Sequence, residues 1–180
     1  MKRYLFVILV LTIATGLWLG IGAQTAPQAP PANPISADLK AMYTGVKNNL
    51  IKMADKMPEE HYAFKATPDI RTFGGLIGHV ADSQTRTCAM LLGEQRTPNA
   101  SSKTSKADLV AALKESFALC DKAVDGMTDA KAAELITTGQ RQSSRAGVLA
   151  RMISHSNEEY GYTAVYMRLK GIVPPSSEGR

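Results

Sequence analysis

Apolar residues recur every three or four positions along four segments of this chain, and this period restricts the fold more than any other feature. Such spacing places the apolar side chains on one face of an α-helix. We expect helices over residues 36–57, 72–93, from 105 onward, and 144–169. The apolar positions of the first three are Leu39, Met42, Tyr43, Val46, Leu50 and Met53; Phe73, Leu76, Ile77, Val80, Cys88, Leu91 and Leu92; and Leu109, Leu113, Phe117, Cys120 and Val124. Helices of this kind bury their apolar faces against one another, so the expected fold is all-α, a four-helix bundle.

Residues that favour helix ends lie at the borders of these segments. Ser36 and Ser105 are suitable N-caps, Pro58 ends the first segment, and Gly171 suits the position after the last helix. A short helical turn is expected at residues 129–135, and no segment shows the alternation of a β-strand.

A charged and then apolar segment precedes the helices. Lys2 and Arg3 are followed by an apolar stretch over residues 4–21 and by small residues at 22–23. This order is typical of a secretory signal peptide, and the stretch is about long enough to span a membrane. Residues 1–23 are therefore interpreted as a signal peptide or a membrane anchor. We expect an exported protein, periplasmic or extracellular, that contacts a membrane only through this segment if it is uncleaved.

Composition divides the rest of the chain. Residues 24–35 are rich in Pro, Ala and Gln and are expected to form an extended linker. One domain is expected over residues 36–173, followed by a flexible tail over 174–180. The formal charge is +5, and +3 without Lys2 and Arg3. Because the sequence has no run of more than two basic residues, it does not indicate a nucleic-acid-binding protein.

Three side chains of the second and fourth helices could form a metal site. His155 and Glu159 are one helical turn apart, with Cβ atoms about 5–6 Å from each other, and they share a stripe with apolar residues. That stripe consists of Val148, Met152, His155, Glu159, Thr163 and Tyr166. The two side chains could hold one divalent ion or form a hydrogen-bonded pair. His79 lies between Leu76 and Val80, beside the apolar face of its helix, and would complete a set of two histidines and one carboxylate.

The remaining reactive side chains allow two interpretations each. Cys88 and Cys120 could form a disulfide in an oxidising compartment or be two small buried residues. His61 lies in a polar connector and is expected to be solvated. Tyr160, Tyr162 and Tyr166 could line a pocket, although aromatic residues at helical spacing also belong to cores.

Two stretches resemble the DinB family, and in particular its exported bacterial branch. They are PEEHYAFKATPDIRTFGGLIGHVADSQ, at 58–84, and SHSNEEYGYTAVYMRLKGIVPPSS, at 154–177. The second contains H-S-N-E-E-Y-G, close to the family's H-x-x-x-H-x-G block. The resemblance implies a four-helix bundle and a divalent metal bound by three histidines, one from the second helix and two from the last.

Position by position, the resemblance places the family's first histidine at His79 and its second at His155. Glu159 stands where the family usually has the third histidine. A carboxylate can bind Zn, Ni, Fe or Mn, so a metal site is expected with a harder ligand set, or else the metal has been lost.

The resemblance also implies a class of function. Some family members resemble metal-dependent thiol transferases and others hydrolases, so we expect such an enzyme acting on a small substrate, with the catalytic residues unassigned. Export disfavours the transferase, because a cytoplasmic thiol would be an unusual partner outside the cell. The alternative is a non-catalytic bundle that binds a ligand or partner and keeps a degraded metal site. A homodimer is the oligomer that the resemblance implies.

Overall fold

The structure is a computed structural model that describes residues 32–179. The predicted signal peptide or anchor and residues 24–31 of the predicted linker lie outside this range. The elements are α1 (Pro34–Lys56), α2 (Phe73–Leu92), α3 (Lys106–Asp125), α4 (Asp129–Ala133), β1 (Leu135–Thr138), β2 (Arg141–Ser144) and α5 (Arg145–Leu169). Short 3-10 turns lie at Glu59–His61, Ala100–Ser102 and Pro175–Ser177. The prediction of four main helices is confirmed.

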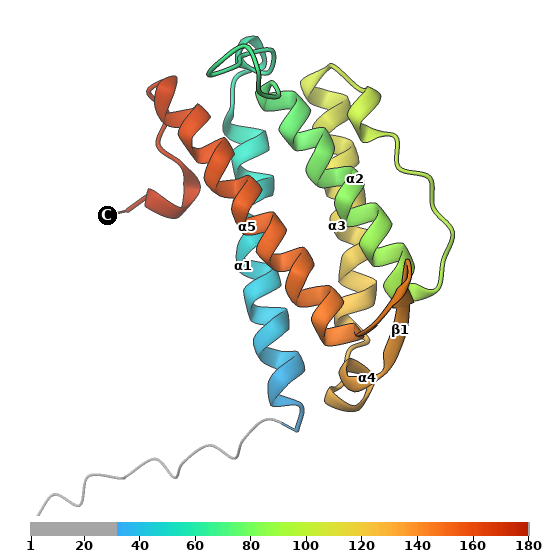
Figure 1. The fold of residues 1–180 in the computed structure, drawn as a ribbon. Coiled ribbons are helices and arrows are strands. Elements are labelled where there is room, and N and C mark those ends of the chain that lie inside the picture. The colour runs from blue at the N-terminus through green and yellow to red at the C-terminus, as the bar shows by residue number, and fades with distance from the viewer. Residues whose placement is uncertain (1–31, 180) are drawn as a thin grey trace, which may run out of the picture. The chain divides into compact units, whose positions relative to one another are not determined.

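The four long helices form a bundle in which α1 and α5 run one way and α2 and α3 the other (Figure 1). Since α2 and α3 are parallel, the segment at 93–105 must return along the whole bundle. Its turn at Ala100–Ser102 lies against α2, where the Asp82 carboxylate accepts hydrogen bonds from the backbone amides of Ala100 and Ser101, at 2.7 and 3.0 Å. The connection is therefore held to the bundle.

The core lies along the predicted apolar faces. Almost every residue of the stripes on α2 and α3 is buried, and so are Val148, Met152, Glu159, Thr163 and Tyr166 of α5. On α1 the prediction was wrong for Met42, whose exposed fraction is 58 %. The buried face of this helix runs through Tyr43, Val46, Leu50 and Met53, and Met42 lies beside that face. The buried set forms one continuous cluster.

The first helix begins before the predicted cap. It starts at Pro34, with Asn33 as the residue before it, and the Ser36 side chain does not cap it. Instead, the carboxylate of Asp129 in α4 accepts hydrogen bonds from the backbone amides of Ile35 and Ser36, at 3.2 and 2.8 Å. An acidic side chain at this end of a helix satisfies free amides and offsets the helix dipole. The caps at Thr72, Ser105 and Ser144 come from the helices' own N-cap side chains.

A hairpin that the sequence analysis did not predict joins α4 to α5. Strands β1 and β2 are antiparallel, with Leu135 opposite Ser144 and Thr138 opposite Arg141. Gly139 begins the two-residue turn with a φ of 65°, which suits a tight hairpin turn. The expectation of no strand was wrong because the strands are only four residues long and mostly polar, so they lack a buried, alternating face.

The C-terminal segment returns to the bundle. The Ser176 amide donates a hydrogen bond to the Tyr160 hydroxyl at 2.9 Å, and Arg168 donates to the Ser177 hydroxyl at 2.9 Å. Lys56 of α1 forms an ion pair with Glu178. Among residues 32–179, no helix is both long and apolar enough to cross a membrane.

A disulfide joins Cys88 of α2 to Cys120 of α3 in the interior, with the two Cα atoms 5.0 Å apart. The two cysteines are therefore a disulfide and not free buried thiols. Gln84 and Met152 lie beside it. The bond links the two parallel helices, which are neighbours in space although 32 residues separate the cysteines.

Replacing both cysteines, as Cys88→Ala with Cys120→Ala, is expected to lower the free energy of unfolding by about 2–4 kcal/mol, because the unfolded chain regains the freedom that the closed loop removes. Urea unfolding followed by circular dichroism measures the change. Reducing agent should destabilise the wild type and leave the double variant unaffected. Equal stability of the two proteins would contradict the structural role of this bond.

At Gly78 the backbone of α2 lies close to the backbone of the turn at 100–102. A Cβ there would lie 3.0 Å from the Ala100 carbonyl oxygen and 3.1 Å from the Ser101 Cα, both backbone atoms. Gly78→Ala is therefore expected to destabilise the protein by about 1 kcal/mol. Gly45 of α1 is the matched control, since a Cβ there meets nothing within 4 Å. Gly45→Ala should instead stabilise the protein by about 0.5–1 kcal/mol, and a gain at both positions would contradict the close contact.

Candidate metal centre

The antiparallel contact between α2 and α5 positions the candidate site. Gln84 of α2 is almost fully buried, and its side-chain amide donates a hydrogen bond to the Ser156 hydroxyl of α5 at 2.6 Å. That hydroxyl in turn donates to the Met152 carbonyl at 2.8 Å. This buried link fixes the register of the two helices one residue from His155, and it brings His79 opposite His155.

All three predicted ligands meet at this contact. The Nε2 atoms of His79 and His155 are 3.2 Å apart, and each lies 3.6 Å from Oε1 of Glu159. Each residue offers one ligand atom, and these three atoms lie within 4.8 Å of one another. The structure thus brings the three residues together as a triad capable of binding a metal. That they do bind one stays a prediction.

The triad lies at the border between core and solvent. The side chains of His79 and His155 are 26 % and 32 % exposed, whereas that of Glu159 is only 7 % exposed. Within the described residues, Oε2 of Glu159 and Nδ1 of His155 are buried and have no hydrogen-bond partner. Buried polar atoms are nearly always paired, and exceptions need a reason such as a bound ion or a catalytic role. The donor set therefore fits a divalent cation, which would compensate the buried carboxylate.

Burial also shifts the pKa of His79 and that of Glu159. It lowers the pKa of His79, and the positive charges of Arg71, His155 and Arg86 act in the same direction. Burial raises the pKa of Glu159, although His155 and Arg71 partly oppose this effect. A low pKa keeps the His79 imidazole neutral and able to bind a metal, which requires an unprotonated nitrogen.

A cleft of about 810 Å³ opens beside Glu159. It lies between the connector before α2 and the C-terminal half of α5. Its lining consists of Lys65, Ala66, Asp69, Ile70, Arg71, Leu76, Glu159, Tyr162, Val165 and Tyr166. This volume is in the range of pockets for small molecules. Of the three triad residues, Glu159 is the one that reaches the cleft.

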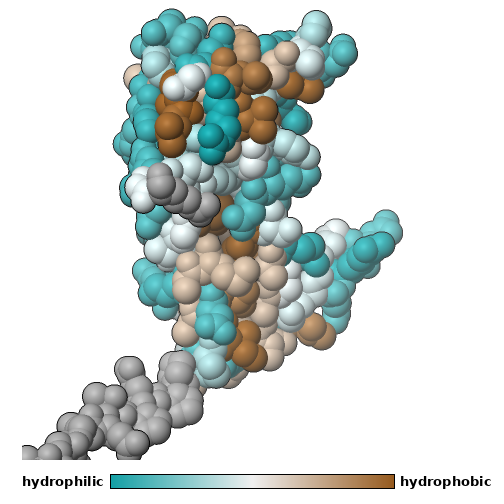
Figure 2. All heavy atoms as spheres, turned by 90° about the vertical axis from the view of Figure 1, so that its left-hand side faces the viewer, coloured by the Kyte–Doolittle hydropathy of each residue, from teal (hydrophilic) through white to brown (hydrophobic). Residues whose placement is uncertain are grey.

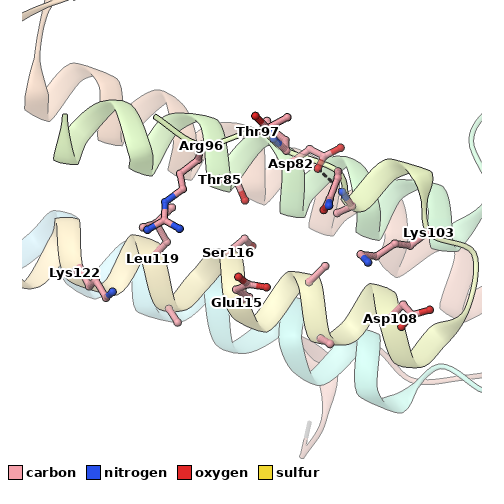
Figure 3. A pocket seen from close by; sticks show the side chains of 16 residues that line it. Asp82, Thr85, Arg96, Thr97, Lys103, Asp108, Glu115, Ser116, Leu119 and Lys122 are labelled. Atoms are coloured by element: carbon pink, nitrogen blue, oxygen red, sulfur yellow. Dashed lines mark hydrogen bonds between the residues drawn. The ribbon is translucent and has the colours of Figure 1, made fainter. Parts of the chain in front are cut away.

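A second cavity of about 450 Å³ lies between α2, α3 and the segment at 93–105 (Figure 3). Figure 3 shows Glu115, Leu119 and Lys122 of α3 on one side, facing Thr85 of α2 and Arg96. Charges of both signs line it, and none of the triad residues does. We therefore place the functional site at the triad and its adjoining cleft.

Sequence reasoning missed the residues of the connector. Arg71 and Lys65 lie in a segment without helical period, so no pattern pointed to them. Of the three tyrosines that were candidates for lining a pocket, Tyr162 and Tyr166 line the cleft. The Tyr160 hydroxyl instead accepts a hydrogen bond from the Ser176 amide. His61 lies in the turn at Glu59–His61 and is not part of the triad.

Comparison with known proteins agrees with this architecture. Residues 42–162 match the sequence model of the DinB superfamily. The match runs from within α1 to within α5 and includes all three residues of the triad. A comparison with curated proteins found no match.

Solved structures show the same fold. A DinB-like protein from Bacillus cereus superimposes with a TM-score of 0.69 at 18 % identity, covering 77 % of this chain and 95 % of that one. A DinB-like protein from Bacillus subtilis gives 0.60 at 16 % identity, covering 74 % and 92 %. A conserved protein from Enterococcus faecalis gives 0.61 at 15 % identity, covering 74 % and 95 %. From its sequence match and its bundle, this chain belongs to the DinB superfamily.

Proposed function

We propose that this protein is an exported, metal-dependent enzyme that hydrolyses a small substrate. His79, His155 and Glu159 hold a divalent ion, Zn, Ni, Fe or Mn, and the substrate occupies the cleft beside Glu159. The observation that carries the proposal is the convergence of three ligand atoms within 4.8 Å, one of them from a carboxylate that is buried without a full set of partners.

The donor types suit this role. Two imidazoles and one carboxylate leave coordination positions open for water or substrate. A divalent ion in such a site acidifies bound water and polarises a substrate carbonyl or phosphoryl oxygen. Oε1 of Glu159 faces both histidines, and within the described residues the buried Oε2 has no hydrogen-bond partner, so the carboxylate keeps the capacity to ligate an ion.

Export is supported by two features. The first 23 residues have the charge and apolar pattern of a signal peptide or anchor. The buried disulfide between Cys88 and Cys120 suits an oxidising compartment. Thiol transfer with a cytoplasmic thiol is disfavoured there, so hydrolysis is the preferred reaction.

A non-catalytic binding bundle is the second candidate, and two observations favour it. Glu159 stands where the family usually has a third histidine. Among residues 32–179, Nδ1 of His155 also has no hydrogen-bond partner, although metal-binding histidines usually donate a hydrogen bond from this second nitrogen to a carboxylate or carbonyl that orients the ring.

Metal content separates the two candidates. The purified wild type is expected to hold about one equivalent of divalent metal, measured by inductively coupled plasma mass spectrometry, because three ligands converge. His79→Ala and Glu159→Ala should each lose most of it. His61→Ala is the matched control, since His61 lies outside the triad, and it should keep the metal.

Retention of metal by both His79→Ala and Glu159→Ala would overturn this ligand assignment. A wild type without metal that gains it after Glu159→His would mean that the scaffold is intact but the site has been given up. That result would favour the binding bundle.

The raised pKa of Glu159 predicts a stability test on metal-free protein. Because the folded pKa lies above the unfolded value, the favourable contribution of this group is present at low pH and is lost as the pH rises through the folded pKa. At pH 7 the buried carboxylate therefore costs stability. Glu159→Gln is expected to raise the melting temperature of the metal-free protein at pH 7 by a few degrees, with a smaller gain near pH 4.

The neighbouring Glu158→Gln is the control for this test. Glu158 is exposed and accepts a hydrogen bond from the Tyr162 hydroxyl, so its replacement should change the melting temperature little. Added metal should reverse the order and make the wild type more stable than Glu159→Gln. A lower melting temperature for metal-free Glu159→Gln at pH 7 would instead assign the carboxylate a structural role.

A further inference from the structure

Basic side chains stand at the cleft beside the triad. Arg71 and Lys65 both line it, and the acidic residues on its wall are Asp69 and Glu159. Because Oε1 of Glu159 faces the two histidines, Arg71 and Lys65 meet a ligand in the cleft with Asp69 as the other acidic residue, and a divalent cation at the triad would add to this positive balance. Positive potential in a cleft favours an anion.

Arg71 has its backbone fixed and its side chain available. The Tyr166 hydroxyl of α5 donates a hydrogen bond to the Arg71 carbonyl at 2.7 Å, which ties the connector to the helix that carries Glu159. Tyr166 is itself held by a T-shaped contact with Phe64. Within residues 32–179 the Arg71 guanidinium forms no ion pair with a carboxylate, and Arg71 is exposed. Arg71 lines the same cleft as Glu159, and its charge lowers the pKa of both His79 and Glu159.

Most of the other residues that line the cleft are apolar or aromatic. Ile70, Leu76, Val165, Tyr162 and Tyr166 contribute apolar surface. Three of them are unusually exposed for large apolar residues, with exposed fractions of 40 % for Ile70, 51 % for Tyr162 and 54 % for Val165. Figure 2 shows hydrophobic residues at the surface near the upper end of the face that it displays. An apolar wall next to an arginine suits a molecule that is apolar at one end and anionic at the other.

We propose that the cleft binds a small amphipathic anion as the substrate of the proposed enzyme, and this inference rests on that proposed function. Arg71 pairs with a carboxylate or phosphate oxygen of the ligand, for which its planar guanidinium offers two parallel donors. Ile70, Leu76 and Val165 bury the apolar body of the ligand. Arg71 thereby holds the bound molecule in the cleft beside Glu159.

Binding of a charged probe and its neutral counterpart tests the proposal. Phenylacetate and phenylacetamide share a ring and differ in charge, and their dissociation constants for the full-length protein can be measured by NMR titration at low ionic strength. Phenylacetate should bind at least fivefold more tightly. Arg71→Gln should remove this preference in the metal-free protein as well as in the metal-loaded one, which separates the arginine from the ion.

Arg86→Gln is the matched control. Arg86 also carries a positive charge that acts on His79, but it lies outside the cleft lining. It should keep the full preference for phenylacetate. Equal binding of the two probes, absence of phenylacetate binding, or an equal loss in Arg71→Gln and Arg86→Gln would each overturn the proposal.

Metal content measured on the same samples distinguishes this inference from the proposed function. Arg71→Gln should keep its metal, since Arg71 is not a ligand. A wild type that holds metal but does not prefer the anion would overturn the cleft assignment alone. A wild type without metal whose preference for phenylacetate depends on Arg71 would overturn the enzyme and leave the anion site standing.

Discussion

The packing of α2 between α3 and α5 is the constraint on which both the core and the candidate site depend. On one side the disulfide fixes α2 to α3, and on the other the buried hydrogen bond from Gln84 to Ser156 fixes it to α5. Gln84 lies beside both links. A shift of α2 by one turn, about 5.4 Å, would break this hydrogen bond and separate His79 from His155. The rigidity of the interior thus sets the geometry of the triad, because side chains on packed helices are held more precisely than side chains on loops.

The buried carboxylate of the triad lowers the stability of the fold. Glu159 is buried, and one of its carboxylate oxygens has no hydrogen-bond partner within the described residues. A hydrophobic residue there would pack at lower cost. Strained or unsatisfied groups of this kind are typical of functional sites, where the fold gives up local stability for chemistry. The neighbouring cleft has a second feature that does not favour stability, since large apolar side chains of α5 remain exposed to solvent there.

The sequence predicted the helices and the shared face of His155 and Glu159 because both follow from the helical period. His155 and Glu159 share a face through their spacing of four, and Leu109, Leu113 and Phe117 mark the buried face of α3 in the same way. Features that depend on contacts between distant segments could not be predicted. The capping of α1 by Asp129 joins residues 93 positions apart. The polar hairpin carries no alternation, and Arg71 reaches the site from an irregular connector. The resemblance to the DinB family indicated which histidines to compare, but only the fold brought the connector to Glu159.

The close fit of Gly78 under the turn at 100–102 has a consequence for how this protein can change over evolution. Connections between helices usually accept insertions and substitutions freely. Here the returning segment lies against the residue that precedes His79, and Asp82, one turn further on, binds its backbone. Insertions that are harmless elsewhere in this segment would displace the part of α2 that carries His79 when they fall at Ala100 or Ser101. The variable part of the connection should therefore be limited to its two ends, and its middle should vary as little as a core helix.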